Sequence, residues 1–251
     1  MEQLTRREFS QQAIGSLLTY SLLETLFAHD AFGSQVRPQT IEWLTQVNAL
    51  GRDAQQQKLP QLEWQKQIER LFGQVNLPDL LKMIDFDQLT RNIKMVDRGE
   101  LSLSFKFPQI DGLPTKYVFG KQIFALKNGR SVVPHGHNNM ATAFLILKGD
   151  LRGRLYDRLE DLPDAYIIKP TLDRKFTQGE CSTISDQKDN VHWFQALSEP
   201  AFIFNIHVLN VSPGLGTPTG RVYLNPLGEK LAGGRIKAPH IDYHTSVQLF
   251  G

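Results

Sequence analysis

The chain has 251 residues, of which 41% are hydrophobic and 22% charged, and its formal net charge is +2. This composition is typical of a soluble globular protein and argues against nucleic acid as a partner and against a polybasic membrane surface. The single cysteine, Cys181, excludes an internal disulfide, and we interpret it as a small buried hydrophobic residue.

Residues 1–33 have the features of an export signal. Arg6 and Arg7 precede a moderately apolar stretch from Ala13 to Ala28. This order resembles a twin-arginine signal, which implies export of the folded protein to the periplasm. The apolar run is shorter than the roughly 20 residues of a membrane span, so we expect membrane association only if the signal stays uncleaved. The alternative is an amphipathic N-terminal helix with a chance arginine pair.

Residues 34–98 are predicted to form a helical N-terminal segment, with a linker over residues 34–40 and a helical pattern from Ile41 to about Val96. Apolar residues recur at helical spacing from Trp43 to Leu50 and again from Leu62 to Phe72. Asn76 and the proline two residues later are typical of the start of a further helix. We expect these helices to form a layer that packs on the domain that follows.

After Gly99 the pattern changes from helix to strand. Leu101, Leu103, Phe105 and Phe107 alternate with polar residues, which predicts a strand with one buried face. Further short apolar runs follow at residues 117–126, 141–147, 166–168, 181–184, 191–197 and 201–211. Many short strands without intervening helices predict a sandwich or barrel. The side chains expected to fill it are Phe144, Ile146, Phe202, Phe204 and Ile206.

Three histidines form a candidate metal site. His135 and His137 are separated by one residue in a predicted strand, so both imidazoles point to the same face. Two imidazoles on one face can bind one metal ion, and a third ligand from a neighbouring strand leaves the open positions that catalysis needs. His192 is the candidate for that third ligand.

The residues around these histidines resemble the motifs of the cupin superfamily. Residues 129–149 have the cupin order of glycine, His-x-His and glycine, and His192 stands where the second cupin motif has its histidine. The turn before it, usually Pro-x-Gly, is replaced by residues 187–190. The resemblance implies a mainly β protein, with a double-stranded β-helix (jelly-roll) barrel over residues 99–251 and the N-terminal helical layer beside it. The cupin glutamate ligand falls at Thr142, which leaves three histidines.

A cupin with three histidines resembles the thiol dioxygenases, which include cysteine dioxygenase and the cysteamine oxidases. That resemblance implies Fe(II) as the cofactor, with a small-molecule thiol and O₂ as substrates, while Mn, Ni and Zn stay open as metals. The family's cross-linked cysteine and tyrosine fall at Thr142 and Leu209, so both are absent. Its serine–histidine–tyrosine chain falls at Asn205, His207 and Leu209, where only the histidine is kept.

Further residues are expected around the metal ligands rather than as ligands. The candidates are His207, Asn205, Thr142 and Arg130. Asn205 or His207 is a candidate partner for the second imidazole nitrogen of a ligand. Lys121 and Arg154 are the other candidates for a substrate-binding cation, and Tyr223 or Tyr243 for the missing phenol. Two other functions remain open, a metal-binding cupin of another chemistry, such as an isomerase or hydrolase, and a non-catalytic ligand-binding cupin. The sequence does not set the oligomeric state.

Overall fold

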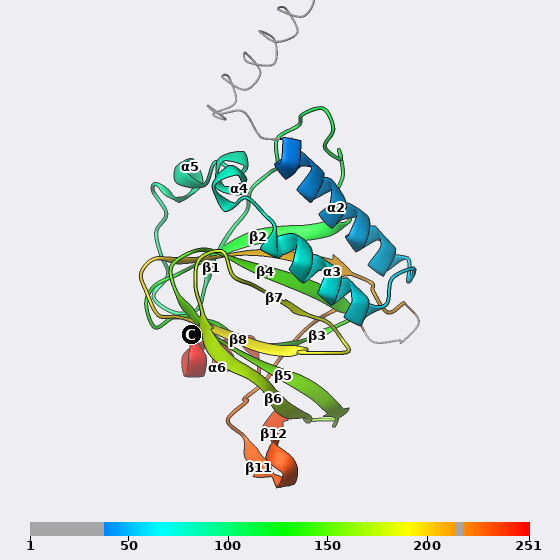
Figure 1. Cartoon of the computed structure of the whole chain (residues 1–251). Coiled ribbons are helices and arrows are strands. Elements are labelled where there is room, and N and C mark those ends of the chain that lie inside the picture. The colour runs from blue at the N-terminus through cyan, green and yellow to red at the C-terminus, as the bar shows by residue number, and fades with distance from the viewer. Residues whose placement is uncertain (1–37, 214–217) are drawn as a thin grey trace, which may run out of the picture.

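The computed structural model describes residues 38–213 and 218–251, with a group of helices followed by two antiparallel sheets (Figure 1). The predicted export signal, residues 1–33, lies outside the described residues. Among the helices in the described part of the chain, none is both long and apolar enough to cross a membrane.

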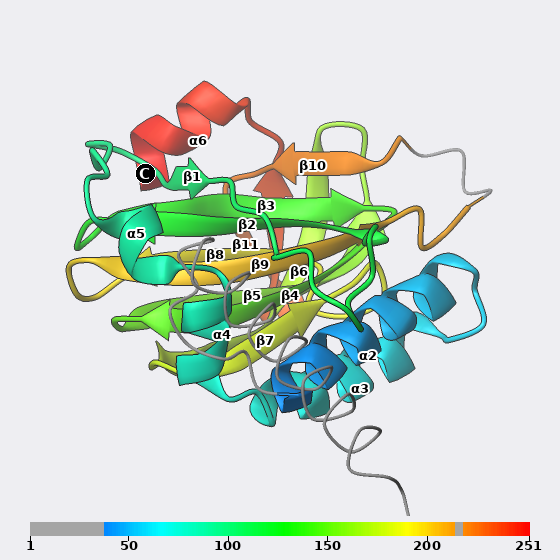
Figure 2. The same cartoon turned by 90° about the horizontal axis from the view of Figure 1, so that it is seen from above.

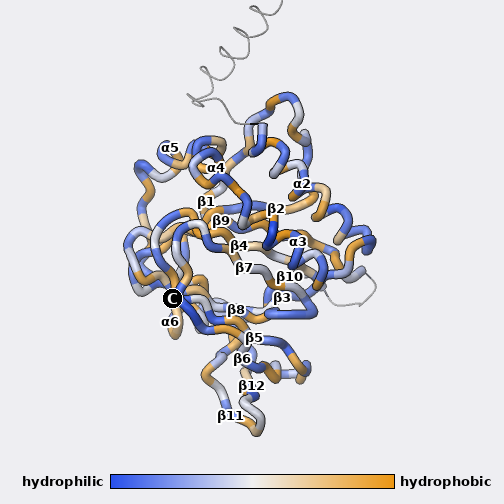
Figure 3. The backbone as a smooth tube through the Cα atoms, viewed as in Figure 1, coloured by the Kyte–Doolittle hydropathy of each residue, from blue (hydrophilic) through white to orange (hydrophobic). Residues whose placement is uncertain are grey.

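Within residues 38–98, the described part of the predicted helical segment, four helices form a layer. They are α2 (Pro38–Gln55), α3 (Gln61–Gly73), α4 (Leu77–Met83) and α5 (Phe86–Thr90). Trp64, Ile68 and Phe72 recur at helical spacing on α3, and all three are buried against the first sheet. The side chain of Asn76 accepts the backbone N–H of Asp79 at 3.1 Å and caps the start of α4. Figure 3 shows hydrophobic and hydrophilic residues alternating along these helices.

The strands form two sheets that face each other, and α2 and α3 cover the outside of the first (Figures 1 and 2). In spatial order, the first sheet consists of β1 (Leu101–Leu103), β2 (Phe119–Leu126), β9 (Ala201–Leu209), β4 (Met140–Lys148) and β7 (Cys181–Ile184). The second consists of β10 (Gly220–Tyr223), β3 (Ser131–Asn138), β8 (Val191–Ala196), β5 (Leu151–Asp161), β6 (Ala165–Phe176), β12 (Arg235–Pro239) and β11 (Glu229–Leu231). A short 3₁₀ turn, Ala232–Gly234, joins β11 to β12, and the chain ends with α6 (Tyr243–Phe250).

The strand pairing is nested, and it defines the topology. β5 pairs with β6, β4 with β7, β3 with β8 and β2 with β9, so each pair encloses the previous one along the chain. A long antiparallel ribbon of this kind, rolled up so that its pairs alternate between two sheets, is a jelly roll. The predicted fold class, a mainly β double-stranded β-helix with an N-terminal helical layer, is confirmed.

Of the three hydrophobic cores among the described residues, two hold the layers together. Phe144 and Ile146 lie in the core between the sheets, as predicted. The prediction that Phe202, Phe204 and Ile206 fill the barrel is wrong, because these side chains pack in the core between the first sheet and the helices. Neighbouring residues of a strand point to opposite faces, and both faces of β9 are largely buried. A continuous apolar run therefore does not reveal which residues face the barrel.

Some elements differ from the prediction. The strand expected over residues 101–107 ends at Leu103, and Phe105 and Phe107 lie in an irregular segment that packs over β2. β5 has no counterpart among the predicted strands, and its outward face carries charged side chains such as Arg152, which is paired with Asp173 at 2.6 Å. The short strands β10 to β12 and helix α6 also have no predicted counterpart. These elements are three to eight residues long, and they are fixed mainly by tertiary pairing.

Candidate metal centre

The structure brings the three predicted histidines together inside the barrel. β3 supplies His135 and His137, and β8 supplies His192, which is paired directly opposite His135. The ring centroids are 5.0 Å apart for His135 and His137, 4.2 Å for His135 and His192, and 5.0 Å for His137 and His192. One ligand nitrogen from each residue lies within 4.8 Å of the other two. The three imidazoles can therefore hold a single ion.

A β-bulge in β3 sets the direction of these side chains. Val132 pairs with Phe194 and His135 pairs with His192, so β3 advances three residues while β8 advances two. The extra residue places both Val132 and His135 on the inner face. Pro134 lies in the bulge, where no backbone N–H is needed for a hydrogen bond between β3 and β8, so the proline does not weaken their pairing.

Burial keeps the three imidazoles neutral. It lowers the pKa of His135 and His137 well below 6.5 and that of His192 to about 3, because a charged imidazole loses its hydration inside the barrel. Repulsion among the histidines and from Arg221 acts in the same direction for His135 and His137. Neutral imidazole is the form that binds metal, so the site is ready for an ion over a wide pH range.

Each ring is held through one nitrogen and offers the other. Nδ1 of His135 lies 2.7 Å from the carbonyl of Val133, Nδ1 of His137 lies 3.2 Å from the hydroxyl of Thr142, and Nδ1 of His192 lies 3.4 Å from the carbonyl of Asn190. Nε2 of His137 and Nε2 of His192 are buried without a hydrogen-bond partner among the described residues. Metal-binding histidines are held in this way, so the donor set fits a transition metal.

Thr142 contacts a candidate ligand, whereas Asn205 and His207 do not bond to any of the three histidines in the described part of the chain. Ile203 on β9 faces the barrel interior. Asn205 and His207 are two and four residues further along the same strand, so their side chains point to the same face. The ring of His207 lies over Gly120, where a Cβ atom would be only 2.5 Å from its Nε2. The expected role of imidazole partner falls to Thr142 and two backbone carbonyls.

The structure does not bring the three predicted cations to the histidines. Arg130 precedes β3, and its guanidinium donates to the carbonyl of Gly251 at 3.2 Å. The ammonium of Lys121 lies 5.3–5.6 Å from the ring centroids of Phe105, Phe107 and Tyr117. The guanidinium of Arg154 lies 4.0 Å from the ring of Trp193, which neighbours His192 and therefore points to the opposite face of β8.

The cation that does face the site is Arg221, which the sequence analysis missed. β10 pairs with β3 so that Arg221 lies opposite His137 and Tyr223 opposite His135. The positive charge of Arg221 lowers the pKa of all three candidate ligands and of His207. The ring of Tyr223 is 5.7 Å from that of His135. A four-residue strand gives too short an alternation to predict this placement.

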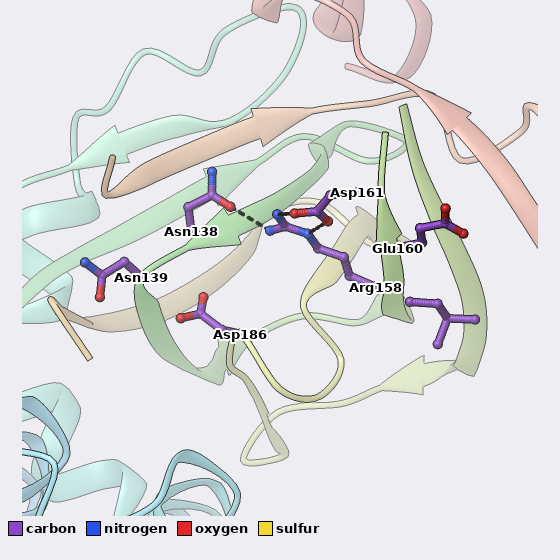
Figure 4. Close-up of a pocket in the computed structure, with 7 residues that line it drawn as sticks. Asn138, Asn139, Arg158, Glu160, Asp161 and Asp186 are labelled. Carbon is purple, nitrogen blue, oxygen red and sulfur yellow. Dashed lines mark hydrogen bonds and ion pairs between the residues drawn. The ribbon is translucent and has the colours of Figure 1, made fainter. Parts of the chain in front are cut away.

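A polar pocket of about 390 Å³ lies beside the backbone of His137 (Figure 4). Its lining residues are Asn138, Asn139, Arg158, Leu159, Glu160, Asp161 and Asp186. Arg158 donates to the carbonyl of His137 at 3.1 Å and to the side-chain oxygen of Asn138 at 2.6 Å, and it forms an ion pair with Asp161. The pocket thus contacts the strand that carries His137 without containing a candidate ligand.

No family model and no curated protein matches this chain. Among solved structures, it is similar to the 11S globulin from Wrightia tinctoria, with 14% identity over 43% of this chain and 23% of that one, at a TM-score of 0.32. A cupin superfamily protein from Desulfitobacterium hafniense shares 15% identity over 47% of this chain and 84% of that one, with a TM-score of 0.31. Oxalate oxidase in complex with glycolate shares 14% identity over 42% and 46%, with a TM-score of 0.32. The matches span about a quarter of the globulin and under half of the oxidase.

Proposed function

We propose that this protein is a metal-dependent oxidoreductase that uses Fe(II) and O₂ to oxidise the sulfur of a small thiol. The observation that carries the proposal is the group of three buried imidazoles, His135, His137 and His192, around one ion-sized space. Among the described residues, no carboxylate belongs to this group. A divalent ion held only by neutral ligands keeps its full charge, which favours an anionic thiolate as a further ligand.

The reaction that fits this donor set is oxygenation of sulfur. Fe(II) suits imidazole ligands, and three protein ligands leave coordination positions for a substrate and O₂. When bound, the iron supplies the oxygen chemistry. One thiol and one O₂ give one sulfinic acid, with both oxygen atoms on sulfur, so the reaction needs no external electrons.

The protein's own side chains orient the ligands and shape the substrate site. The hydroxyl of Thr142 is within hydrogen-bond distance of Nδ1 of His137 and orients its ring. The ring centroid of Phe144 lies 5.1 Å from that of His192, and the phenyl ring shields the imidazole from water. No ion pair to Arg221 is found among residues 38–213 and 218–251. Its guanidinium is the candidate to bind an anionic group on the substrate, such as a carboxylate, and its charge also acts on the buried carboxyl group of Glu100. Tyr223, whose ring centroid is 5.7 Å from that of His135, is the candidate phenol beside the site.

Oxygen consumption with defined thiols tests the proposal. The full chain is loaded with Fe(II) without oxygen, its metal content is measured, and O₂ uptake is followed with cysteine, cysteamine, 3-mercaptopropionate and a cysteinyl peptide. We expect uptake with at least one thiol and a product that has gained two oxygen atoms. Iron-loaded protein that consumes no O₂ with any of them would refute the thiol reaction. Mn, Ni or Zn instead of iron in protein purified from its native host would point to another cupin chemistry, whereas affinity for added Zn²⁺ would not, because imidazole sites bind several divalent metals.

We also propose that the protein is exported to the periplasm by the twin-arginine route. The proposal rests on Arg6 and Arg7 ahead of the apolar stretch in residues 13–28. Replacement of both arginines by lysine should leave the protein in the cytoplasm, as measured by cell fractionation. Unchanged export of this variant would contradict the proposal.

A further inference from the structure

We propose that Asn190 is a positioning residue that holds the metal ligand His137 by its main chain. This inference rests on the proposed metal centre and adds to it a residue that contributes no ligand atom. Asn190 is 1% exposed and directly precedes β8, two residues before His192. The sequence pattern makes it part of a turn, whereas its side chain points back to β3.

The side-chain amide of Asn190 bonds both main-chain polar groups of His137. Its Oδ1 accepts the backbone N–H of His137 at 3.2 Å, and its Nδ2 donates to the carbonyl of His137 at 2.8 Å. The same Nδ2 donates to the carbonyl of Ser185 at 3.1 Å. The last paired residues of β3 and β8 are His135 and His192. Beyond this pair, the side-chain bonds of Asn190 replace the backbone hydrogen bonds between the two strands. They fix the main chain of His137 relative to the strand that carries His192.

Gly136, between the two histidines of β3, fits this arrangement. A Cβ atom at position 136 would lie 2.8 Å from Oδ1 of Asn190 and 3.2 Å from a methyl group of Val191. Only a glycine leaves room for the amide at that distance. The His-Gly-His sequence thus provides two ligands and the space for the group that holds one of them.

The pattern of donors and acceptors makes an amide specifically suited to position 190. An asparagine supplies an acceptor for the N–H and a donor for the carbonyl of one residue, whereas a carboxylate supplies only acceptors and an alanine supplies neither. The carbonyl of His137 receives a second donor, Arg158, from the pocket in Figure 4. The carbonyl of Asn190 itself lies 3.4 Å from Nδ1 of His192, so this residue contacts two of the three candidate ligands.

Zinc affinity of the full-length protein tests the role of Asn190. Zn²⁺ is titrated against a chromogenic chelator, and the absorption spectrum of the Co²⁺ form reports the ligand geometry. We expect Asn190→Ala to weaken zinc binding about 10- to 100-fold, the usual loss when a group that supports a ligand is removed. Asn190→Asp, which keeps only the acceptor, should fall between wild type and Asn190→Ala. Gly136→Ala displaces the amide without removing it and should also weaken zinc binding and change the Co²⁺ spectrum.

A double-mutant cycle separates positioning from general stability. In a His137→Ala background the positioned ligand is gone, so Asn190→Ala should change the remaining zinc affinity by less than about two-fold. Val191→Ala is the matched control, because Val191 is equally buried but does not bond to His137, and its zinc affinity should stay near that of wild type. An equal loss on Asn190→Ala in both backgrounds would overturn the proposal.

The outcomes distinguish this inference from the proposed function. If wild-type protein and Asn190→Ala bind zinc equally tightly, the role of Asn190 is refuted and the metal centre stands. If wild-type protein binds neither Zn²⁺ nor Co²⁺, the metal centre itself is refuted.

Discussion

The hydroxyl of Thr142 lies 3.2 Å from Nδ1 of His137. Thr142 is on β4 of the first sheet, and His137 is on β3 of the second sheet, which faces it. At the position that resembles a cupin glutamate ligand, this chain therefore has a neutral hydroxyl group. That hydroxyl contacts the imidazole of His137 and is not itself a candidate metal ligand. This relationship orients the ring of His137 so that its Nε2 is directed away from Thr142. It also keeps the donor set free of negative charge.

Thr142→Val should weaken metal binding about ten-fold, because the isosteric side chain cannot hydrogen bond to Nδ1 of His137. Zinc titration measures the change. Thr183→Val is the control, because Thr183 is as deeply buried but bonds to Gln65 and Glu69 rather than to a histidine. Equal zinc affinities for Thr142→Val and wild type would show that the hydroxyl does not orient the ring.

His192→Ala should prevent the purified protein from retaining a stoichiometric amount of metal, since the two imidazoles left on β3 bind an ion only weakly. Metal analysis of purified protein measures this. His240→Ala removes a histidine that lies elsewhere in the fold, against Tyr166 at a ring distance of 4.5 Å, and should retain the metal. An unchanged metal content in His192→Ala would remove that residue from the site.

The metal-free protein should lose stability as the pH falls below 6.5. Burial lowers the pKa of His207 from 6.5 to about 4, so between these values the unfolded chain binds more protons than the folded one and protonation favours unfolding. Relative to His207→Gln, the wild type should lose up to about 3 kcal/mol across this window.

Denaturant titrations of both proteins at several pH values measure this difference. The comparison with His207→Gln is needed because burial raises the pKa of Glu100 and Asp186, and these carboxyl groups act in the opposite direction. Parallel stability curves for the two proteins would show that His207 keeps an ordinary pKa.

Arg221→Gln should raise the KM for thiols that carry a carboxylate about 10- to 100-fold, the effect of losing a hydrogen bond to a charged group. Cysteamine, which has no carboxylate, should be affected little. Arg130→Gln is the control, because that guanidinium contacts Gly251 rather than the histidines. A similar loss for cysteamine and 3-mercaptopropionate would exclude Arg221 as the anion-binding group.

Gly153→Ala should destabilise the barrel by about 1–3 kcal/mol, because the added methyl group overpacks the core. Its Cβ atom would lie 2.5 Å from the ring of Phe176 and 2.7 Å from that of Phe194. Gly73→Ala places a methyl group where, apart from its chain neighbours and the backbone of its own helix, no atom lies within 4 Å, and it should be neutral or slightly stabilising. Urea denaturation of the two variants measures the contrast, and equal stabilities would mean that the core has spare room.

The sequence predicts the part of the site that has a local pattern. His135 and His137 stand out because a strand has a period of two, and residues 129–149 and His192 follow cupin spacing. The helical layer is predictable for the same reason, since Trp64, Ile68 and Phe72 repeat at helical spacing.

The rest of the site depends on which strands become neighbours. Arg221 reaches the histidines only because β10 pairs with β3, and Asn190 reaches His137 only because its side chain crosses between strands. Neither Arg221 nor Asn190 belongs to a local sequence pattern that predicts a place in the site. Arg130 is a candidate from the sequence only because it is close to His135 along the chain. Proximity along the chain is a poor guide in a fold built on nested long-range pairs.

The pairing of β3 with β8 also links metal binding to folding. The histidines of β3 and His192 are more than 50 residues apart in sequence, and the hairpins β5–β6 and β4–β7 are nested between them. The three histidines come together only when β3 pairs with β8, so metal uptake is coupled to formation of the barrel. A chain exported after folding would therefore carry the ion selected by the compartment in which it folded, whatever metals are abundant at its destination.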